Sequence, residues 1–183
     1  MSISVRPKLQ AGSVCCWQSD WIESVLAQAY KIASKIVVAY GMERKAYETG
    51  FRHDDTLLKI VSFPDPDRKI TIKARIFWEG LNDLSNACID RSGDSDFYLK
   101  LDGDEVMSEA FMEEFLSLIP EAVERELPIT ADYWHFIRDF THVISDPIYH
   151  EYRLRGFPIV LGISFCHPDF LNTVFPSITT ASL

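Results

Sequence analysis

Two histidines and two aspartates recur at intervals of three or four residues in the C-terminal half of the chain, at His135, Asp139, His142 and Asp146. On a helix this spacing places all four side chains along one stripe. Imidazole and carboxylate groups are ligands that zinc and similar divalent metals accept, so His135, Asp139 and His142 form a candidate metal site. Histidine and aspartate pairing on a wetted helix face explains the same pattern, because the apolar positions of the segment lie on another face.

A second group is acidic and flanks a short alternating segment: Asp94 and Asp96 precede it, and Asp102, Asp104 and Glu105 follow it. The spacing resembles an EF-hand calcium loop, which has acidic residues at its first, third and twelfth positions. The resemblance fails in the middle, because the position that needs a glycine for a sharp turn holds a leucine. The pattern therefore favours an acidic loop before a strand and a helix cap after it.

Cysteine and histidine occur together at Cys166-His167-x-Asp169, the residue types of a nucleophile, a base and an orienting acid. Neighbouring residues on a strand point to opposite faces, so these side chains do not form a triad there. The adjacent Cys15 and Cys16 could close only a strained ring, and we expect them to pack as small apolar side chains. All four thiols are expected to be reduced. The sequence contains no glycine-rich phosphate loop, His-Glu-x-x-His pair or Cys-x-x-Cys pair.

Charge is unevenly distributed along the chain. Residues 79–126 contain fourteen acidic and three basic residues, a formal charge of −11 in a chain whose net charge is −9. Such a field repels nucleic acid and anionic lipid and attracts basic partners or cations. A tryptophan exposed amid charge is a common anchor of protein interfaces. The candidate partner-binding residues are Asp94, Asp96, Asp102, Asp104, Glu105, Glu109, Glu113 and Trp134.

Three segments have apolar residues at helical spacing and would position these groups. The first covers residues 20–40 and is followed by Gly41, which can end a helix in a left-handed turn. The second covers residues 105–119, after which Pro120 begins a short acidic turn or helix. The third covers residues 130–144, and it would carry the candidate metal ligands.

Four other segments have the patterns of strands. Residues 56–63 and 69–78 flank a turn rich in proline and aspartate, so we expect them to form a hairpin. Residues 96–101 are expected to form a short strand with Tyr98 facing outward. Residues 157–165 are nearly all apolar and should form a central strand buried on both faces.

These elements predict one α+β domain over residues 1–183, with a four- to five-stranded antiparallel or mixed sheet packed against about three helices. About ten residues at each end are expected to be loosely ordered. The N-terminus lacks the apolar core of a signal peptide, and no run is long and apolar enough to span a membrane. We therefore expect a soluble cytoplasmic protein.

The acidic segment supports the leading functional hypothesis. It predicts a protein-binding module of the inhibitor, immunity or adaptor type that engages a basic partner protein, with no direct contact to nucleic acid or membrane. The alternative is an enzyme or small-ligand-binding protein with a pocket between the sheet and the helices, assisted by a metal on the histidine and aspartate stripe. The sequence favours binding over catalysis, requires no cofactor and does not determine the oligomeric state.

Overall fold

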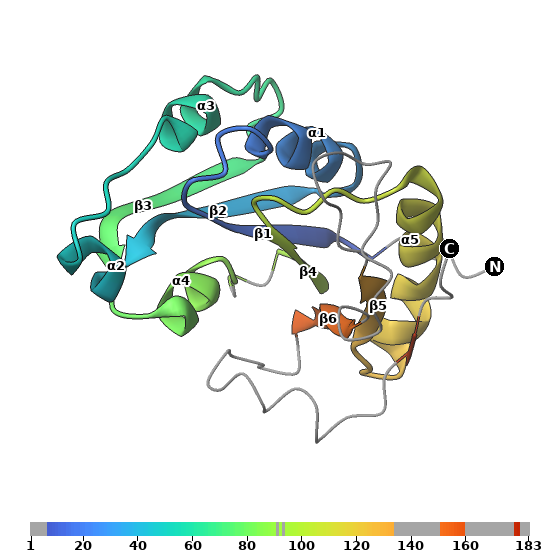
Figure 1. Cartoon of the computed structure of the whole chain (residues 1–183). Coiled ribbons are helices and arrows are strands. Elements are labelled where there is room, and N and C mark those ends of the chain that lie inside the picture. Colours follow the sequence, from blue (N-terminus) through green and yellow to red (C-terminus); the bar gives the residue numbers. More distant parts are fainter. Residues whose placement is uncertain (1–6, 91, 93, 134–150, 160–177, 180–183) are drawn as a thin grey trace.

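The computed structural model describes residues 7–90, 92, 94–133, 151–159 and 178–179. In this part of the chain, seven strands form one sheet in the order β3-β2-β1-β4-β6-β5-β7 (Figure 1). The strands are β1 (Leu9–Cys15), β2 (Lys35–Glu43), β3 (Ile70–Trp78), β4 (Phe97–Asp102), β5 (Ile129–Tyr133), β6 (Glu151–Pro158) and β7 (Ile178–Thr179). The helices are α1 (Ile22–Ile32), α2 (Arg44–Glu48), α3 (Thr56–Ser62), α4 (Leu81–Ala87) and α5 (Glu109–Glu124).

The sheet is parallel over one half and antiparallel next to it. Strands β3, β2, β1 and β4 are all parallel, β6 is antiparallel to β4, and β5 is antiparallel to β6. The sheet is therefore mixed, one of the two forms expected, and larger than the four or five strands expected. The chain runs from β1 outward to β2 and β3 and then returns to the other side of β1 as β4. The strand order thus reverses between β1 and β4.

Helices cover both faces of the parallel half, as parallel strands require. Figure 1 shows α1 and α3 above the sheet and α4 below it. Apolar residues of α1, α3 and α5 share one core cluster with β1, β2 and β4. The opposite face is covered by α4, where Leu84 and Cys88 pack with Ala39, Tyr98 and Phe157. Tyr98 is buried there, so the expectation that it faces outward is wrong.

Helix α1 ends at Ile32, and the second half of the segment expected to be a single helix, residues 20–40, is strand β2. Every residue from Ile36 to Tyr40 is apolar and buried. A central parallel strand requires a continuous apolar run, whereas a helix against a core requires apolar residues only every third or fourth position. The prediction of a single helix over residues 20–40 failed because the apolar stripe of α1 is followed closely by the apolar run of β2. Several residues of that run continue the helical spacing of the stripe.

The predicted hairpin is wrong in its first strand. Residues 56–62 form helix α3, and only the second segment is a strand, which pairs parallel with β2. A turn does separate the two elements, because the Asp65 carboxylate accepts hydrogen bonds from the backbone N–H groups of Lys69 at 2.8 Å and Ile70 at 3.0 Å. Parallel neighbours need a long crossover instead of a tight hairpin, and α3 lies within that crossover.

The elements in the middle of the chain, β4 and α5, lie closer to the positions that the sequence predicts. Strand β4 confirms the short strand expected at residues 96–101. Helix α5 confirms the helix expected over residues 105–119, but it starts at Glu109 and continues through Pro120 to Glu124. The Ser108 hydroxyl caps its start by accepting the Phe111 N–H at 3.1 Å.

The predicted C-terminal elements are partly outside the described residues. Residues 130–133 belong to β5, so the helix expected over residues 130–144 is wrong at its start. Of the strand expected at residues 157–165, Phe157 and Pro158 form the end of β6, which lies between β4 and β5. Phe157 is buried, as expected for a central strand. Ile159 follows β6 and donates its N–H to the Asp96 carbonyl at 3.0 Å, and the rest of both segments lies outside the described residues.

Of the first ten residues, Leu9 and Gln10 belong to β1 in the centre of the parallel half, and residues 1–6 lie outside the described part of the chain. Both residues are buried. In the part of the chain that the structure describes, no helix is long and apolar enough to cross a bilayer. Cys15, Cys16 and Cys88 are free thiols, in agreement with the expectation that they are reduced.

Candidate functional site at the carboxyl edge of the parallel strands

The carboxyl ends of β1 and β4 lie side by side at the reversal of strand order. In open α/β sheets, ligands bind in the crevice outside the carboxyl ends of the strands at such a reversal. The turn after β1 contains Cys16, Trp17 and Gln18, and the turn after β4 contains Gly103 and Asp104. These two turns define the candidate site.

Gly103 holds the two turns together. Its N–H donates a hydrogen bond to the Val14 carbonyl at 3.0 Å. A β-carbon at this position would lie 2.8 Å from the Cys15 β-carbon and 3.2 Å from the Gln18 side chain. The close approach of the two backbones therefore requires glycine.

We expect Gly103→Ala to destabilise the fold by about 1–3 kcal/mol, because the added methyl group pushes the β4 turn away from β1. Chemical denaturation measures this loss. Gly80→Ala is the matched control, since a methyl group there meets open space, and its expected cost is under about 1 kcal/mol from a weaker helix cap. Equal losses in the two variants would contradict the close packing of the turns.

Two carboxylates flank Gly103. The Asp102 carboxylate accepts two hydrogen bonds from the Lys100 ammonium, at 2.6 and 2.7 Å. The backbone N–H of Asp102 donates to the Glu105 carboxylate at 2.9 Å, and the Glu105 N–H donates to the Asp102 carbonyl at 3.1 Å. Glu105 is buried and stabilises the turn, whereas Asp104 is exposed. Asp104 is therefore the carboxylate more available to a ligand.

The exposed indole ring of Trp17 lies beside the two turns. Its backbone has φ of +58°, a left-handed conformation that is uncommon for a bulky residue. The indole N–H donates to the Arg52 carbonyl at 2.5 Å, and the ring centre lies 5.0 Å from that of Phe51. Both rings are exposed to solvent. An exposed aromatic pair at a sheet edge offers a surface on which a planar ligand can stack.

A hydrogen-bonded chain connects β2 to the loop before α3. The Nε2 atom of His53 lies 2.8 Å from the Ile76 carbonyl, which can only accept, so Nε2 donates. In the neutral ring Nδ1 then accepts, and the Tyr40 hydroxyl donates to it at 2.7 Å. Burial, with smaller contributions from Cys16 and Asp54, raises the pKa of Tyr40 to about 12. The phenol is therefore protonated at neutral pH.

The adjacent thiols of Cys15 and Cys16 are protonated at neutral pH. Burial raises the pKa of Cys16 to about 11, and the Asp54 carboxylate adds to the shift. Burial also raises the pKa of Cys15 well above its usual range. Since the thiolate is the reactive form, neither group is a nucleophile at neutral pH, in agreement with the packing role expected for them.

The structure separates the predicted partner-binding residues into groups. Asp94 and Asp96 precede β4 at the amino edge of the sheet, whereas Asp102 and Asp104 lie at the carboxyl edge, a strand length of roughly 20 Å away. The Asp96 carboxylate accepts the Lys8 backbone N–H at 2.7 Å.

The remaining predicted site residues fall in three places. Glu109 and Glu113 are exposed on the first turns of α5. Glu105 is buried, so it does not contribute to an exposed binding face. The other predicted residues lie outside those that the structure describes: Trp134, His135, Asp139 and His142.

Trp17, Gln18 and His53 were not identified as site residues from the sequence. The order of the elements was a possible signal, because the short segment before Cys15 is followed by a helix and then by the apolar run of β2, as in a βαβ unit. Interpreting residues 20–40 as one helix removed β2 from this unit and with it the position of the site.

A divalent cation would find two suitable oxygen donors here, Asp102 and Asp104. Among the described residues, no group of three or more histidine, cysteine, aspartate or glutamate side chains could hold a metal. Mg²⁺ commonly binds through one or two carboxylates, with water and substrate phosphates completing its shell. Two carboxylates, one of which Lys100 already engages, are therefore too few for a metal held by the described protein groups alone.

No protein-family model and no curated protein matches this sequence. Among solved structures, the chain resembles the crystal structure of S. aureus TarS 1-349, with 12% sequence identity and a TM-score of 0.49. The match covers 72% of this chain and 37% of that one, so the chain spans little more than a third of the structure it resembles.

Proposed function

We propose that this chain binds a nucleotide-type ligand at the carboxyl edge of β1 and β4, with a divalent cation bridging the ligand phosphates to Asp102 and Asp104. The observation that carries the proposal is the reversal of strand order at the point where these two carboxylates emerge. Nucleotides bind at this position in doubly wound sheets.

The β1 turn explains why a cation is needed. Dinucleotide-binding sheets cradle phosphate in a glycine-rich turn at the amino end of the first helix. Here that turn reads Cys16-Trp17-Gln18-Ser19 and contains no glycine, and no side chain caps α1 at Trp21. Two carboxylates nearby would repel phosphate. A divalent cation removes this repulsion and provides the positive charge that the turn lacks.

A cation bound by Asp102 and Asp104 also supports a class of reaction, group transfer from a nucleotide-activated donor. A cation that binds a diphosphate stabilises the charge that develops when the diphosphate departs. We therefore infer a transferase that uses a nucleotide-activated donor. The exposed rings of Trp17 and Phe51 provide a surface for the base or for the transferred group.

Calorimetric titration with nucleoside diphosphates and nucleotide-linked sugars, with Mg²⁺ or Mn²⁺ present, tests the proposal. We expect binding that disappears when EDTA removes the cation. Asp104→Asn should weaken binding by about tenfold or more, and more than Asp102→Asn, because Lys100 already engages Asp102. Glu113→Gln on the exposed face of α5 is the control and should bind as the wild type does. Binding that persists in EDTA would contradict the proposal.

The second proposal is the acidic protein-binding module. The exposed carboxylates of Asp104, Glu109 and Glu113 support it, since they follow one another from the β4 turn into α5. Capture of a basic partner that weakens when these three are changed to amides, without any nucleotide binding, would favour this function.

A further inference from the structure

A hollow of about 340 Å³ opens at the amino edge of the sheet, opposite the candidate site. Four basic residues line it, Lys8, Lys35, Arg68 and Lys69, together with one acidic residue, Asp94. Lys8 precedes β1, Lys35 begins β2, Arg68 and Lys69 precede β3, and Asp94 precedes β4. A chain of net charge −9 thus concentrates positive charge at one end of its parallel strands.

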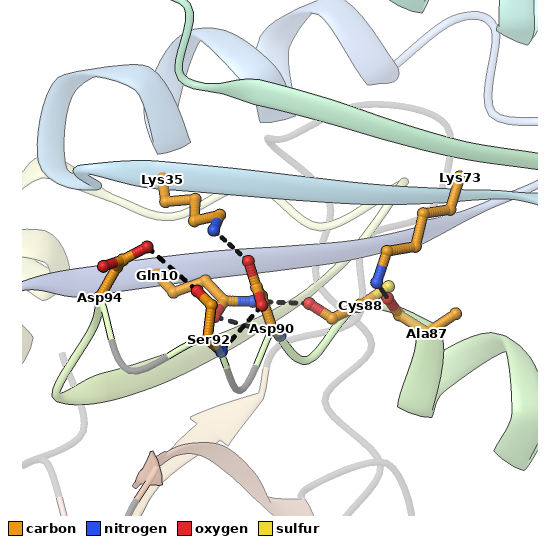
Figure 2. Close-up of polar contacts among 8 residues, drawn as sticks. All are labelled: Gln10, Lys35, Lys73, Ala87, Cys88, Asp90, Ser92 and Asp94. Carbon is orange, nitrogen blue, oxygen red and sulfur yellow. Dashed lines mark hydrogen bonds and ion pairs between the residues drawn. The ribbon is translucent and has the colours of Figure 1, made fainter.

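Two of the four cations are already engaged. Lys35 forms an ion pair with Asp90 in the connection between α4 and β4 (Figure 2). The Lys69 ammonium donates to the Tyr30 carbonyl at 3.0 Å and lies 4.5 Å from the centre of the Tyr30 ring. These contacts fix the two side chains without using all of their donors.

The other two cations are uncompensated. Within the described part of the chain, neither the Lys8 ammonium nor the Arg68 guanidinium has a hydrogen-bond or ion-pair partner. The one carboxylate at the hollow, Asp94, accepts a hydrogen bond from the Ser92 hydroxyl at 3.1 Å (Figure 2). Basic side chains therefore outnumber acidic ones among the residues that line the hollow. Asp90, which pairs with Lys35, and Asp67, whose carboxylate lies 3.9 Å from the Lys69 ammonium, balance part of this charge from outside the lining.

A buried hydroxyl provides an independent observation. Ser95 borders the same hollow and is only 9% exposed, yet its hydroxyl has no hydrogen-bond partner among the described residues. Buried polar groups are rarely left without a partner, and an unsatisfied hydroxyl is a place where a water or a ligand oxygen can bind. A ligand oxygen in the hollow would satisfy this hydroxyl once the Ser95 side chain rotates toward it, because its oxygen is closed off from solvent in the chain alone.

The backbone at this edge is well fixed. The Lys8 carbonyl accepts the N–H groups of Asp96 at 2.9 Å and Phe97 at 3.2 Å, and the Lys69 carbonyl accepts the Ile36 N–H at 2.9 Å. The basic side chains therefore extend from strands whose relative positions are set by the sheet. This reduces the entropy lost when a ligand binds.

We propose that this hollow binds the phosphate group of a small metabolite, through Lys8, Arg68 and the Ser95 hydroxyl, with Lys35 and Lys69 adding charge. Phosphate fits because its several oxygens can accept from a guanidinium, an ammonium and a hydroxyl at once. The volume suits a small molecule. A long polyanion would also meet the acidic remainder of the chain, which repels it.

Titration with inorganic phosphate and pyrophosphate in EDTA, followed by amide chemical shifts, tests this site. EDTA removes any cation-dependent binding at the carboxyl edge, so failure here and failure of the proposed nucleotide site are distinguishable. We expect shifts around Lys8, Arg68 and Ser95 and a dissociation constant that rises with salt. Arg68→Gln and Ser95→Ala should each weaken binding by about threefold to tenfold.

A charge-matched pair of variants provides the control. Lys8→Gln with Arg68→Gln should abolish binding, whereas Arg44→Gln with Lys45→Gln removes the same charge next to β2 at the other edge and should leave binding within about twofold. Lys8, Arg68 and Lys45 are exposed, and Arg44 is half-buried with an ion pair to the exposed Glu79, so melting temperatures should change little. Equal binding by the two double variants, or no shifts with phosphate up to about 10 mM, would overturn the proposal.

Discussion

Val38→Asp is expected to prevent folding, with a loss of more than about 4 kcal/mol. Val38 is 0% exposed in the centre of β2, between Ser13 of β1 and Ile72 of β3. The substitution removes apolar burial and places an unpaired carboxylate inside the sheet. Chemical denaturation followed by circular dichroism measures the effect.

Val61→Asp is the matched control, because it makes the same chemical change at a residue of α3 that is 57% exposed. We expect it to cost less than about 1 kcal/mol. The pair also distinguishes the structure from a single helix over residues 20–40, which would leave Val38 off the apolar stripe and tolerant of aspartate. A folded Val38→Asp variant would therefore show that β2 is not a central strand.

Phe115→Ala is expected to cost about 3–5 kcal/mol. Phe115 is 0% exposed on α5, and its ring meets that of Phe97 on β4 edge to face, with centres 6.0 Å apart. The adjacent Leu116 is 37% exposed, so Leu116→Ala should cost less than about 1 kcal/mol. Thermal and chemical denaturation of the two variants measure the difference.

Phe115→Ala should also affect ligand binding at the candidate site. Helix α5 follows directly after the turn that carries Asp102 and Asp104, so loosening α5 should weaken cation-dependent ligand binding as well as stability. If Phe115→Ala and Leu116→Ala prove equally stable, α5 does not pack on the face of the sheet that holds α1.

Local patterns determined some elements well. Residues 97–102 alternate strongly, and the segment after Ser108 has apolar residues at helical spacing, so β4 and α5 were predicted close to their observed positions. Asp65 lies in a turn, as the prolines around it indicate. These features depend on interactions within a few residues, and the sequence pattern reports such interactions directly.

Other elements were decided by the tertiary structure. Ile36, Val37 and Tyr40 continue the helical spacing of α1, and the pairing of the whole run with β1 and β3 makes it a strand. Residues 56–62 were predicted to be a strand, yet parallel pairing of β2 with β3 requires a crossover, and α3 forms part of it. Strand order is a property of the whole sheet, so no short window contains it.

The sequence by itself determined that this chain has an acidic segment and a mixture of helices and strands, because the charge follows from residue types and the mixture from the local spacing of apolar residues. Only the tertiary structure decided where the acidic groups lie. It placed Asp94 and Asp96 at one edge of the sheet and Asp102 and Asp104 at the other, since successive parts of an extended strand cannot share one end. It also brought Lys8, Arg68 and Ser95 to one hollow from three distant segments, because parallel strands align their amino ends.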